Sequence, residues 1–164
     1  MNTLILISIL VLCTLGVSFL IWMLLKCISI YKRQSLDFSN SMTINNMPII
    51  TLNYKDRELN FLIDSGSNIS LINSLSLKRM VVETNLSMIS IGGIGGSIEK
   101  AMHLKLVLHK NKTLYECEFY TSNMENTFKQ VGESGIHIDG IIGNDFLLKN
   151  KIIIDYDKQL AYTR

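Results

Sequence analysis

A chain of 164 residues has room for one globular domain and one additional segment. It carries 16 basic and 14 acidic residues, and the first three basic ones, Lys26, Lys32 and Arg33, follow an uncharged N-terminal stretch. The 13 basic residues that remain nearly balance the 14 acidic ones, so the charge gives no reason to expect a nucleic-acid partner.

The N-terminal stretch is an uncharged run of 23 residues from Thr3 to Leu25, dominated by Leu, Ile, Val and Phe. About 20 such residues cross the hydrocarbon core of a bilayer as a helix, and Trp22 suits the interface. A cleaved signal peptide is the alternative, but it is expected to have positive charge before a shorter apolar core. The sequence therefore favours a single-pass anchor over residues 1–26, in contact with the membrane through residues 3–25.

The side of the membrane follows from the charges after the run. Lys and Arg close to the end of a span are retained on the cytoplasmic side. Lys26, Lys32 and Arg33 all lie there. The rest of the chain is therefore expected to face the cytoplasm.

Cysteine and histidine usage gives no sign of a disulfide or a metal site. Two of the three cysteines lie within the first 27 residues, so Cys117 has no partner in the soluble part. His103, His109 and His137 show no ligand spacing with the cysteines. A reducing compartment is consistent with this pattern.

Residues 27–47 are predicted to be a juxtamembrane linker, because the stretch 34–47 is polar and aperiodic. A domain over 48–164 follows. Its expected strands are short and separated by turn signals; they cover residues 49–54, 58–63, 68–72, 88–91, 101–108, 113–121, 136–142, 152–154 and 159–162. Ser74 is expected to cap a short helix at 75–80, Asn144 is expected to cap another, and residues 122–135 are expected to form a surface loop. This succession predicts an all-β, barrel-like domain.

The strand at 58–63 runs into the turn Asp64-Ser65-Gly66-Ser67, and a second apolar strand leaves it. Asp-Ser-Gly is common turn chemistry, because Asp and Ser bond to nearby backbone and Gly accepts positive φ. A carboxylate between two buried strands is also held rigidly at the floor of a cleft, where desolvation can change its pKa. The tripeptide alone does not decide between these two interpretations.

A glycine-rich stretch, Gly92-Gly93-Ile94-Gly95-Gly96, follows the strand that ends at Ile91. Four glycines cannot form a stable strand interior, but they suit the tip of a hairpin. A nucleotide-binding loop is the alternative. The spacing G-x-G-x-x-G is absent and no Gly-Lys-Ser/Thr follows, so phosphate binding is not expected.

Three separated motifs together resemble one family, the retropepsin-like aspartic proteases. Asp64-Ser65-Gly66-Ser67 resembles their active-site loop, Ile91-Gly92-Gly93-Ile94-Gly95-Gly96 resembles the flap of the retroviral enzymes, and Ile141-Ile142-Gly143 before Asn144 resembles their second apolar strand and following helix. The motifs occur in the family's order, and the resemblance covers residues 48–164. It implies a closed β-barrel that forms half of an enzyme, with one short C-terminal helix, preceded here by a transmembrane helix that retroviral enzymes lack.

The resemblance also implies roles. Asp64 would be the catalytic carboxylate, Ser65 would hydrogen-bond across a dimer, and Gly66 would let the backbone turn. Ser67 stands where retroviral enzymes usually have Ala. A hydroxyl there that donates to the carboxylate would lower the pKa of the catalytic pair.

The chain holds only one such loop, because Asp139-Gly140 lacks the intervening Ser or Thr and Asp145 and Asp155 are expected at a helix start and in a strand. Peptide hydrolysis of this kind needs one charged and one protonated carboxylate. The resemblance therefore implies a homodimer with one Asp64 from each copy, an extended polypeptide substrate beneath the two flaps, and neither metal nor cofactor. It also implies pairing of the C-terminal strand 159–162 with its counterpart in the other copy.

Two other functions stay open. The domain could be a catalytically inactive retropepsin fold that serves as a dimerisation or peptide-binding module at the membrane. It could also be a membrane protein whose β-domain binds an unrelated partner, although no motif points to that.

Overall fold

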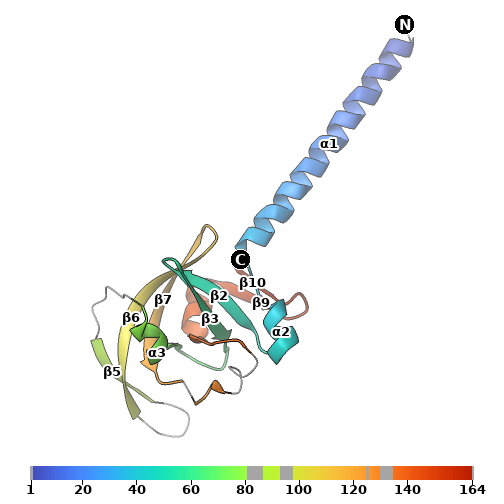
Figure 1. Ribbon diagram of the computed structural model, residues 1–164. Coiled ribbons are helices and arrows are strands. Elements are labelled where there is room, and N and C mark those ends of the chain that lie inside the picture. The colour runs from blue at the N-terminus through green and yellow to red at the C-terminus, as the bar shows by residue number, and fades with distance from the viewer. Residues whose placement is uncertain (1, 81–86, 93–97, 125, 130–134, 164) are drawn as a thin grey trace. The chain divides into compact units, whose positions relative to one another are not determined.

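The computed structural model describes residues 2–80, 87–92, 98–124, 126–129 and 135–163, and it divides the chain into two units, Met1–Gln34 and Ser35–Arg164. The first unit is helix α1 (Asn2–Gln34) (Figure 1). Within it, Ile7–Ile28 is long and apolar enough to cross a membrane, and none of that segment is buried. The expected apolar N-terminal helix is confirmed by length and composition.

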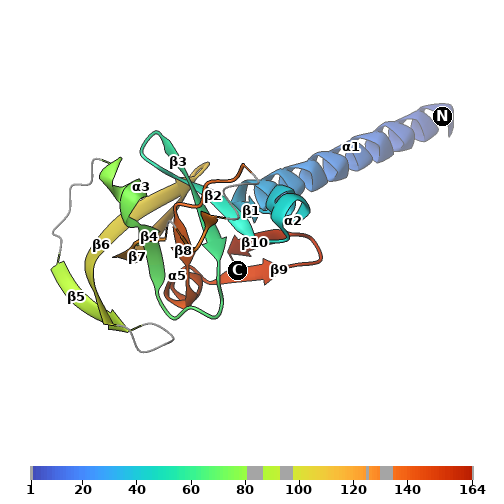
Figure 2. The ribbon, with the colours of Figure 1, turned by 60° about the horizontal axis from the view of Figure 1, so that its bottom comes forward.

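The second unit is mostly β and contains a closed barrel of six strands. In barrel order the strands are β2 (Ile49–Tyr54), β3 (Arg57–Ile63), β8 (Gly140–Ile142), β4 (Ser70–Asn73), β7 (Thr113–Ser122) and β6 (Ile98–Lys110). A pairing of β6 with β2 through His109 and Asn53 closes the ring. β5 (Ser87–Gly92) extends the sheet beyond β6 (Figure 2). The expected barrel is thus confirmed.

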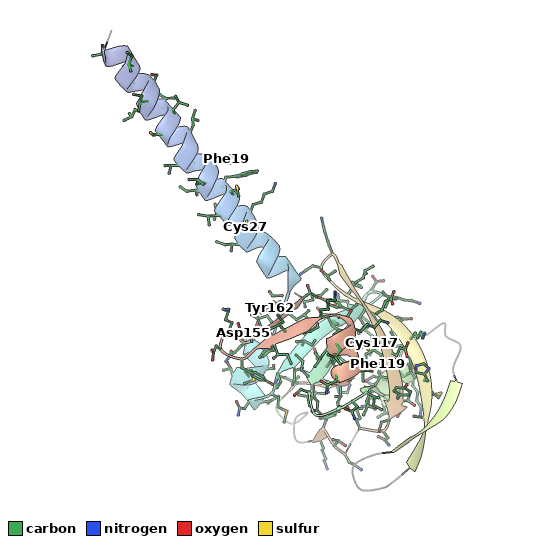
Figure 3. All side chains as sticks on the ribbon, turned by 180° about the vertical axis from the view of Figure 1, so that it is seen from behind. Phe19, Cys27, Cys117, Phe119, Asp155 and Tyr162 are labelled. Atoms are coloured by element: carbon green, nitrogen blue, oxygen red, sulfur yellow. The ribbon has the colours of Figure 1, made fainter. Side chains whose placement is uncertain are left out.

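Alternation of apolar and polar residues explains which side chains fill the barrel. On β6, Leu104, Leu106 and Leu108 are buried while Lys105 and Val107 are exposed, as the period of two requires. Phe119 of β7 and Phe61 of β3 stack inside the barrel, with 5.3 Å between ring centroids. Figure 3 marks Cys117 and Phe119, the buried residues two positions apart on β7.

The β2–β3 hairpin forms where the sequence predicts it. Its register pairs Ile49 with Leu62 and Tyr54 with Arg57. Lys55 has a φ of 53°, and this left-handed conformation lets the chain reverse within a tight turn. The alternation on β3 buries Leu59, Phe61 and Ile63 inside the barrel.

The two predicted helices are present, but their caps differ from the expectation. In α3 (Ser74–Lys78) the capping side chain belongs to Asn73, which accepts a hydrogen bond from the backbone of Leu75. In α5 (Asn144–Lys149) the N-cap is Gly143. The Asn144 side chain instead donates to another loop, described below.

The segment expected to be a linker is folded. It forms β1 (Ser35–Asp37) and α2 (Ser39–Asn45), and Leu36 and Phe38 are each only 1% exposed. Two apolar residues at a spacing of two suffice to bury this strand among polar neighbours. Ser41 is buried as well, and its hydroxyl group hydrogen-bonds the carbonyl oxygens of Phe38 and Met47.

A second sheet has the order β1, β10 (Leu160–Thr163) and β9 (Ile152–Asp155). Figure 3 marks Asp155 and Tyr162 on its two C-terminal strands. Both edges of β10 are occupied within the chain, by β1 and by β9. The expected pairing of residues 159–162 with a second copy is therefore wrong for this arrangement.

The glycine-rich hairpin is described only in its arms. β5 and β6 pair from Ser87 opposite His103 to Gly92 opposite Ile98, with Ile91 opposite Glu99. The hairpin prediction is confirmed for these strands. The tip residues Gly93, Ile94, Gly95 and Gly96 lie outside the described residues.

Candidate active site

Asp64 follows the last residue of β3, and its loop leads to β4. β8 is inserted between these two strands, parallel to β3 and antiparallel to β4. The backbone N–H of Asp64 donates to the carbonyl oxygen of Ile142 at 3.0 Å, which continues the β3–β8 ladder by one residue. The carboxylate is thereby fixed at the end of a buried strand pair.

The Asp64 carboxylate is half-buried. Its Oδ1 accepts one hydrogen bond, from the backbone N–H of Gly66 at 2.9 Å. Within the described residues Oδ2 accepts none, and the neighbouring Ser65 is exposed. One carboxylate oxygen is thus held by the loop and the other is available to a molecule outside the chain.

The loop is braced by the start of α5. The backbone N–H of Ser67 donates to the Asp64 carbonyl oxygen at 3.1 Å, and that of Asn144 donates to the Ser67 carbonyl oxygen at 2.8 Å. The Asn144 side chain donates to the carbonyl oxygen of Ser65, also at 2.8 Å. The turn is therefore held by a hydrogen bond within the loop and by two hydrogen bonds from Asn144 of α5.

A hydrogen-bonded pair of the buried Ser70 and the half-buried Asp145 supports the same region, and the sequence did not indicate it. Both carboxylate oxygens of Asp145 accept from Ser70, at 2.6 Å from the hydroxyl group and 3.0 Å from the backbone N–H. The Ser70 hydroxyl oxygen in turn accepts from the backbone N–H of Gly143 at 3.0 Å. Both oxygens of Asp145 are therefore occupied by hydrogen bonds within the chain.

The position of Ser67 corrects one expectation. Its hydroxyl group donates to the carbonyl oxygen of Ile69 at 2.7 Å, and not to the Asp64 carboxylate. This short-range bond stabilises the loop where it turns into β4. The Ser67 hydroxyl group is therefore not a donor to the Asp64 carboxylate in this structure.

Close packing requires one glycine near the loop and leaves little room for a side chain at another. A Cβ atom on Gly143 would lie 2.5 Å from the carbonyl oxygen of Ile69, a distance that backbone cannot accommodate without moving. A Cβ atom on Gly66 would lie 3.1 Å from Oδ1 of Asp64. Gly143 thus permits the loop and α5 to approach each other, and Gly66 leaves room for the Asp64 carboxylate that its N–H binds.

An apolar row lies on the outer face of the barrel beside Asp64. Leu62, Ile141 and Leu71 are opposite one another on β3, β8 and β4, and all three are half-buried. Asp64 follows Leu62 at the strand period of two and so lies on the same face. Ile142, by contrast, is fully buried inside the barrel.

Two other aspartates and the cysteine of the second unit are less suited to catalysis than Asp64. Asp139 is 5% exposed and accepts hydrogen bonds from Ser76 and from the backbone of Asn60. Hydrogen bonds from Lys158 lower the pKa of Asp155, which keeps that carboxylate charged. Burial raises the pKa of the Cys117 thiol, so Cys117 stays protonated.

Within the part of the chain that the structure describes, no three His, Cys, Asp or Glu side chains lie close enough to hold a metal ion. Comparison with models of known protein families finds no match, and comparison with curated proteins finds none.

Proposed function

We propose that the chain is a membrane-anchored, homodimeric aspartic endopeptidase. The observation that carries the proposal is the half-buried Asp64 carboxylate: one oxygen accepts a hydrogen bond from its own loop, and the other accepts none within the described residues. The order of the three motifs that resemble the retropepsin-like proteases supports the same function.

The chemistry is general acid–base activation of water. In a dimer, two Asp64 carboxylates at close range cannot both ionise, so the pair shares one proton and titrates in two steps. The charged carboxylate takes a proton from water and the protonated one polarises the peptide carbonyl. No covalent intermediate forms, and the proton returns to the leaving amine.

The surroundings of Asp64 suit an extended peptide. Leu62, Ile141 and Leu71 offer apolar contacts beside the carboxylate, while the exposed Ser65 is free to reach a second copy. The two hairpins that begin at β5 would cover the peptide and exclude water. The single anchor places both copies in one membrane, which raises their effective concentration.

The test uses the full chain in detergent, incubated with a peptide library at a series of pH values from acidic to neutral. Wild-type chain is expected to cleave selected bonds and Asp64→Asn is expected to cleave none of them. Equal cleavage by both proteins, or none by either, would contradict the proposal. Binding of peptides without cleavage would favour the inactive module instead.

The cytoplasmic side is part of the proposal, since Lys26, Lys32 and Arg33 follow the apolar helix. A cysteine introduced at the exposed Asp56 of the full chain in sealed cells tests it, with Cys13 and Cys27 replaced by Ser. Protection from an impermeant maleimide until the cells are opened agrees with a cytoplasmic domain, and labelling of intact cells contradicts it.

A further inference from the structure

Two hairpin tips lie together at one end of the barrel (Figure 1). The β2–β3 tip and the β6–β7 tip are joined where Asn53 pairs with His109, and the His109 Nε2 lies 3.0 Å from the Lys55 carbonyl oxygen. The segment after α3 reaches the same end, because the Arg57 side chain donates to the Arg79 carbonyl oxygen at 2.9 Å. Three segments that are distant in the sequence therefore meet here: 55–58, 78–79 and 110–112.

These three segments carry an excess of positive charge. They hold two acidic residues, Asp56 and Glu58, and six basic ones. The basic residues, all exposed except one that is half-buried, Lys110, are Lys55, Arg57, Lys78, Arg79, Lys110 and Lys112. Elsewhere in residues 35–164, twelve acidic residues outnumber seven basic ones. The balanced total thus conceals a concentration of positive charge, and we call this part of the barrel the basic end.

Two large apolar side chains are exposed beside the β6–β7 tip. Leu114 of β7 is 69% exposed and Val107 of β6 is 51% exposed. Basic side chains around exposed apolar ones are typical of surfaces that lie in the headgroup region of a bilayer. There the lysine and arginine side chains meet anionic headgroups, and the apolar side chains contact the acyl boundary.

The length of α1 holds the barrel near a membrane. The segment of α1 that is apolar enough to span ends at Ile28, and β1 begins at Ser35, directly after the helix. Residues 29–34 rise by only about 9 Å as a helix. The potential of an anionic membrane surface decays over about 8 Å at physiological ionic strength, so the second unit begins close to its range. Because the anchor makes docking intramolecular, a weak contact is sufficient.

We propose that the basic end of the barrel docks on the anionic lipid headgroups of the membrane in which α1 is anchored. The inference rests on the anchor in the proposed function, and it needs neither the Asp64 chemistry nor a dimer. Asp64 follows β3 at the end opposite to Arg57, and the seven residues of β3 span about 23 Å. Docking therefore leaves the Asp64 loop directed away from the lipid, where a peptide can reach it.

The first test uses the full chain with Cys13→Ser and Cys27→Ser, reconstituted in vesicles that include a lipid with a quencher on its headgroup. A fluorophore is attached at Leu114→Cys in the test variant. The matched control carries it at Asn68→Cys, an exposed position in the Asp64 loop at the other end of the barrel. The vesicles contain phosphatidylcholine alone, or about two parts phosphatidylcholine to one part phosphatidylserine.

The label at Leu114→Cys should be quenched strongly in vesicles with phosphatidylserine and weakly without it, and added salt should reduce the quenching. The label at Asn68→Cys should be quenched weakly in both. Equal quenching at the two positions, or none at Leu114→Cys, would overturn the inference. Quenching at Leu114→Cys that does not depend on phosphatidylserine would overturn it as well, and would leave the basic end for a soluble polyanion such as nucleic acid.

A second variant, Lys112→Glu, reverses one charge of the basic end in the labelled Leu114→Cys chain. Lys129→Glu is the matched control, because Lys129 is also exposed and follows Phe128, which packs in the cluster around Ile49 at the other end of β2. We expect Lys112→Glu to lower the ratio of docked to undocked chain about fivefold or more, and Lys129→Glu to leave it unchanged. The thermal midpoint in detergent reports whether the barrel stays folded. A folded Lys112→Glu chain that is quenched like its parent would also overturn the inference.

These outcomes separate docking from the proposed function. A chain that does not float with phosphatidylcholine vesicles would have no anchor, and this result would remove the docking as well. Phosphatidylserine-dependent quenching at Leu114→Cys without Asp64-dependent cleavage would leave the docking and remove the protease function. Asp64-dependent cleavage with quenching that ignores phosphatidylserine would leave the protease function and remove the docking.

Discussion

Two aspartates lie at opposite ends of the paired strands β3 and β8, and their surroundings differ. Asp139 precedes β8 and is 5% exposed; its carboxylate accepts from the Ser76 hydroxyl at 2.7 Å and the Asn60 backbone at 2.9 Å. The His137 side chain lies 3.4 Å from the same carboxylate. Asp64 follows β3, is half-buried, and accepts one bond from Gly66.

The difference separates a structural carboxylate from one that is available for chemistry. Burial of a carboxylate removes it from water, and this desolvation cost must be offset by hydrogen-bond donors of the chain. Asp139 has such donors. Asp64 keeps one oxygen without a donor among the described residues, at a site that the backbone holds in place. Substitutions at the two positions should therefore affect different measurable properties.

The largest expected effect is on catalysis, from Asp64→Asn. Removal of a general acid–base group costs about 10²- to 10⁴-fold in rate, and we expect a loss in this range or greater. The free energy of unfolding should change by less than about 0.5 kcal/mol, because the Gly66 N–H keeps an oxygen acceptor. Cleavage rate and urea denaturation measure the two quantities; a folded, fully active variant contradicts the comparison.

The next effect is on stability, from Asp139→Ala. The substitution leaves the Ser76 hydroxyl and the Asn60 N–H without their acceptor inside the protein, and we expect a loss of about 2–4 kcal/mol. Asp139→Asn retains one oxygen and should lose less. Urea denaturation measures both variants, and a stability equal to that of wild type for Asp139→Ala would show that this end of the strand pair is not structural.

A smaller effect is expected for Ser67→Ala. Because the hydroxyl group donates to Ile69 and not to Asp64, the pH dependence of cleavage should keep its position, while the free energy of unfolding falls by about 1 kcal/mol. Cleavage rates across the pH series measure the first quantity and urea denaturation the second. A profile displaced to higher pH would mean that the hydroxyl group turns to the carboxylate when substrate binds.

Local patterns predicted much of the barrel. The hairpin from 49 to 63 and the leucine face of β6 follow from alternation and turn chemistry, which act over a few residues. The segment at 34–47 was misjudged because its apolar content is only Leu36, Phe38 and a few neighbours. Its burial depends on strands β10 and β2, which are distant in the sequence.

The supporting contacts of the site were harder to predict. Ser70 and Asp145 are 75 residues apart in the sequence, and no local pattern joins them. The hydrogen bond from the Ser67 hydroxyl group to the Ile69 carbonyl oxygen is local. Serine side chains commonly bond to nearby backbone in this way, so the sequence could have suggested it. The basic end of the barrel could not be predicted, because its three segments meet only in the folded structure.

The smallest expected effect is on stability, from a substitution of a carboxylate on the exposed face of the barrel. Glu118 is 39% exposed and lies 3.1 Å from Lys105 and 3.2 Å from His103. Hydrogen bonding from Lys105, then from His103, lowers the pKa of Glu118 below its ordinary value of 4.5. A carboxylate whose pKa is lower in the folded state stabilises the fold above its unfolded pKa, and this contribution is lost as the pH falls through the folded value. Solvent screening limits it to a few tenths of a kcal/mol.

Glu118→Gln should therefore be slightly less stable than wild type at pH 6, and the difference should disappear below about pH 4. Glu58→Gln, on the exposed start of β3, should show no such difference in stability. A stability difference between Glu118→Gln and wild type that grows as the pH falls would contradict stabilisation by the hydrogen bonds from Lys105 and His103.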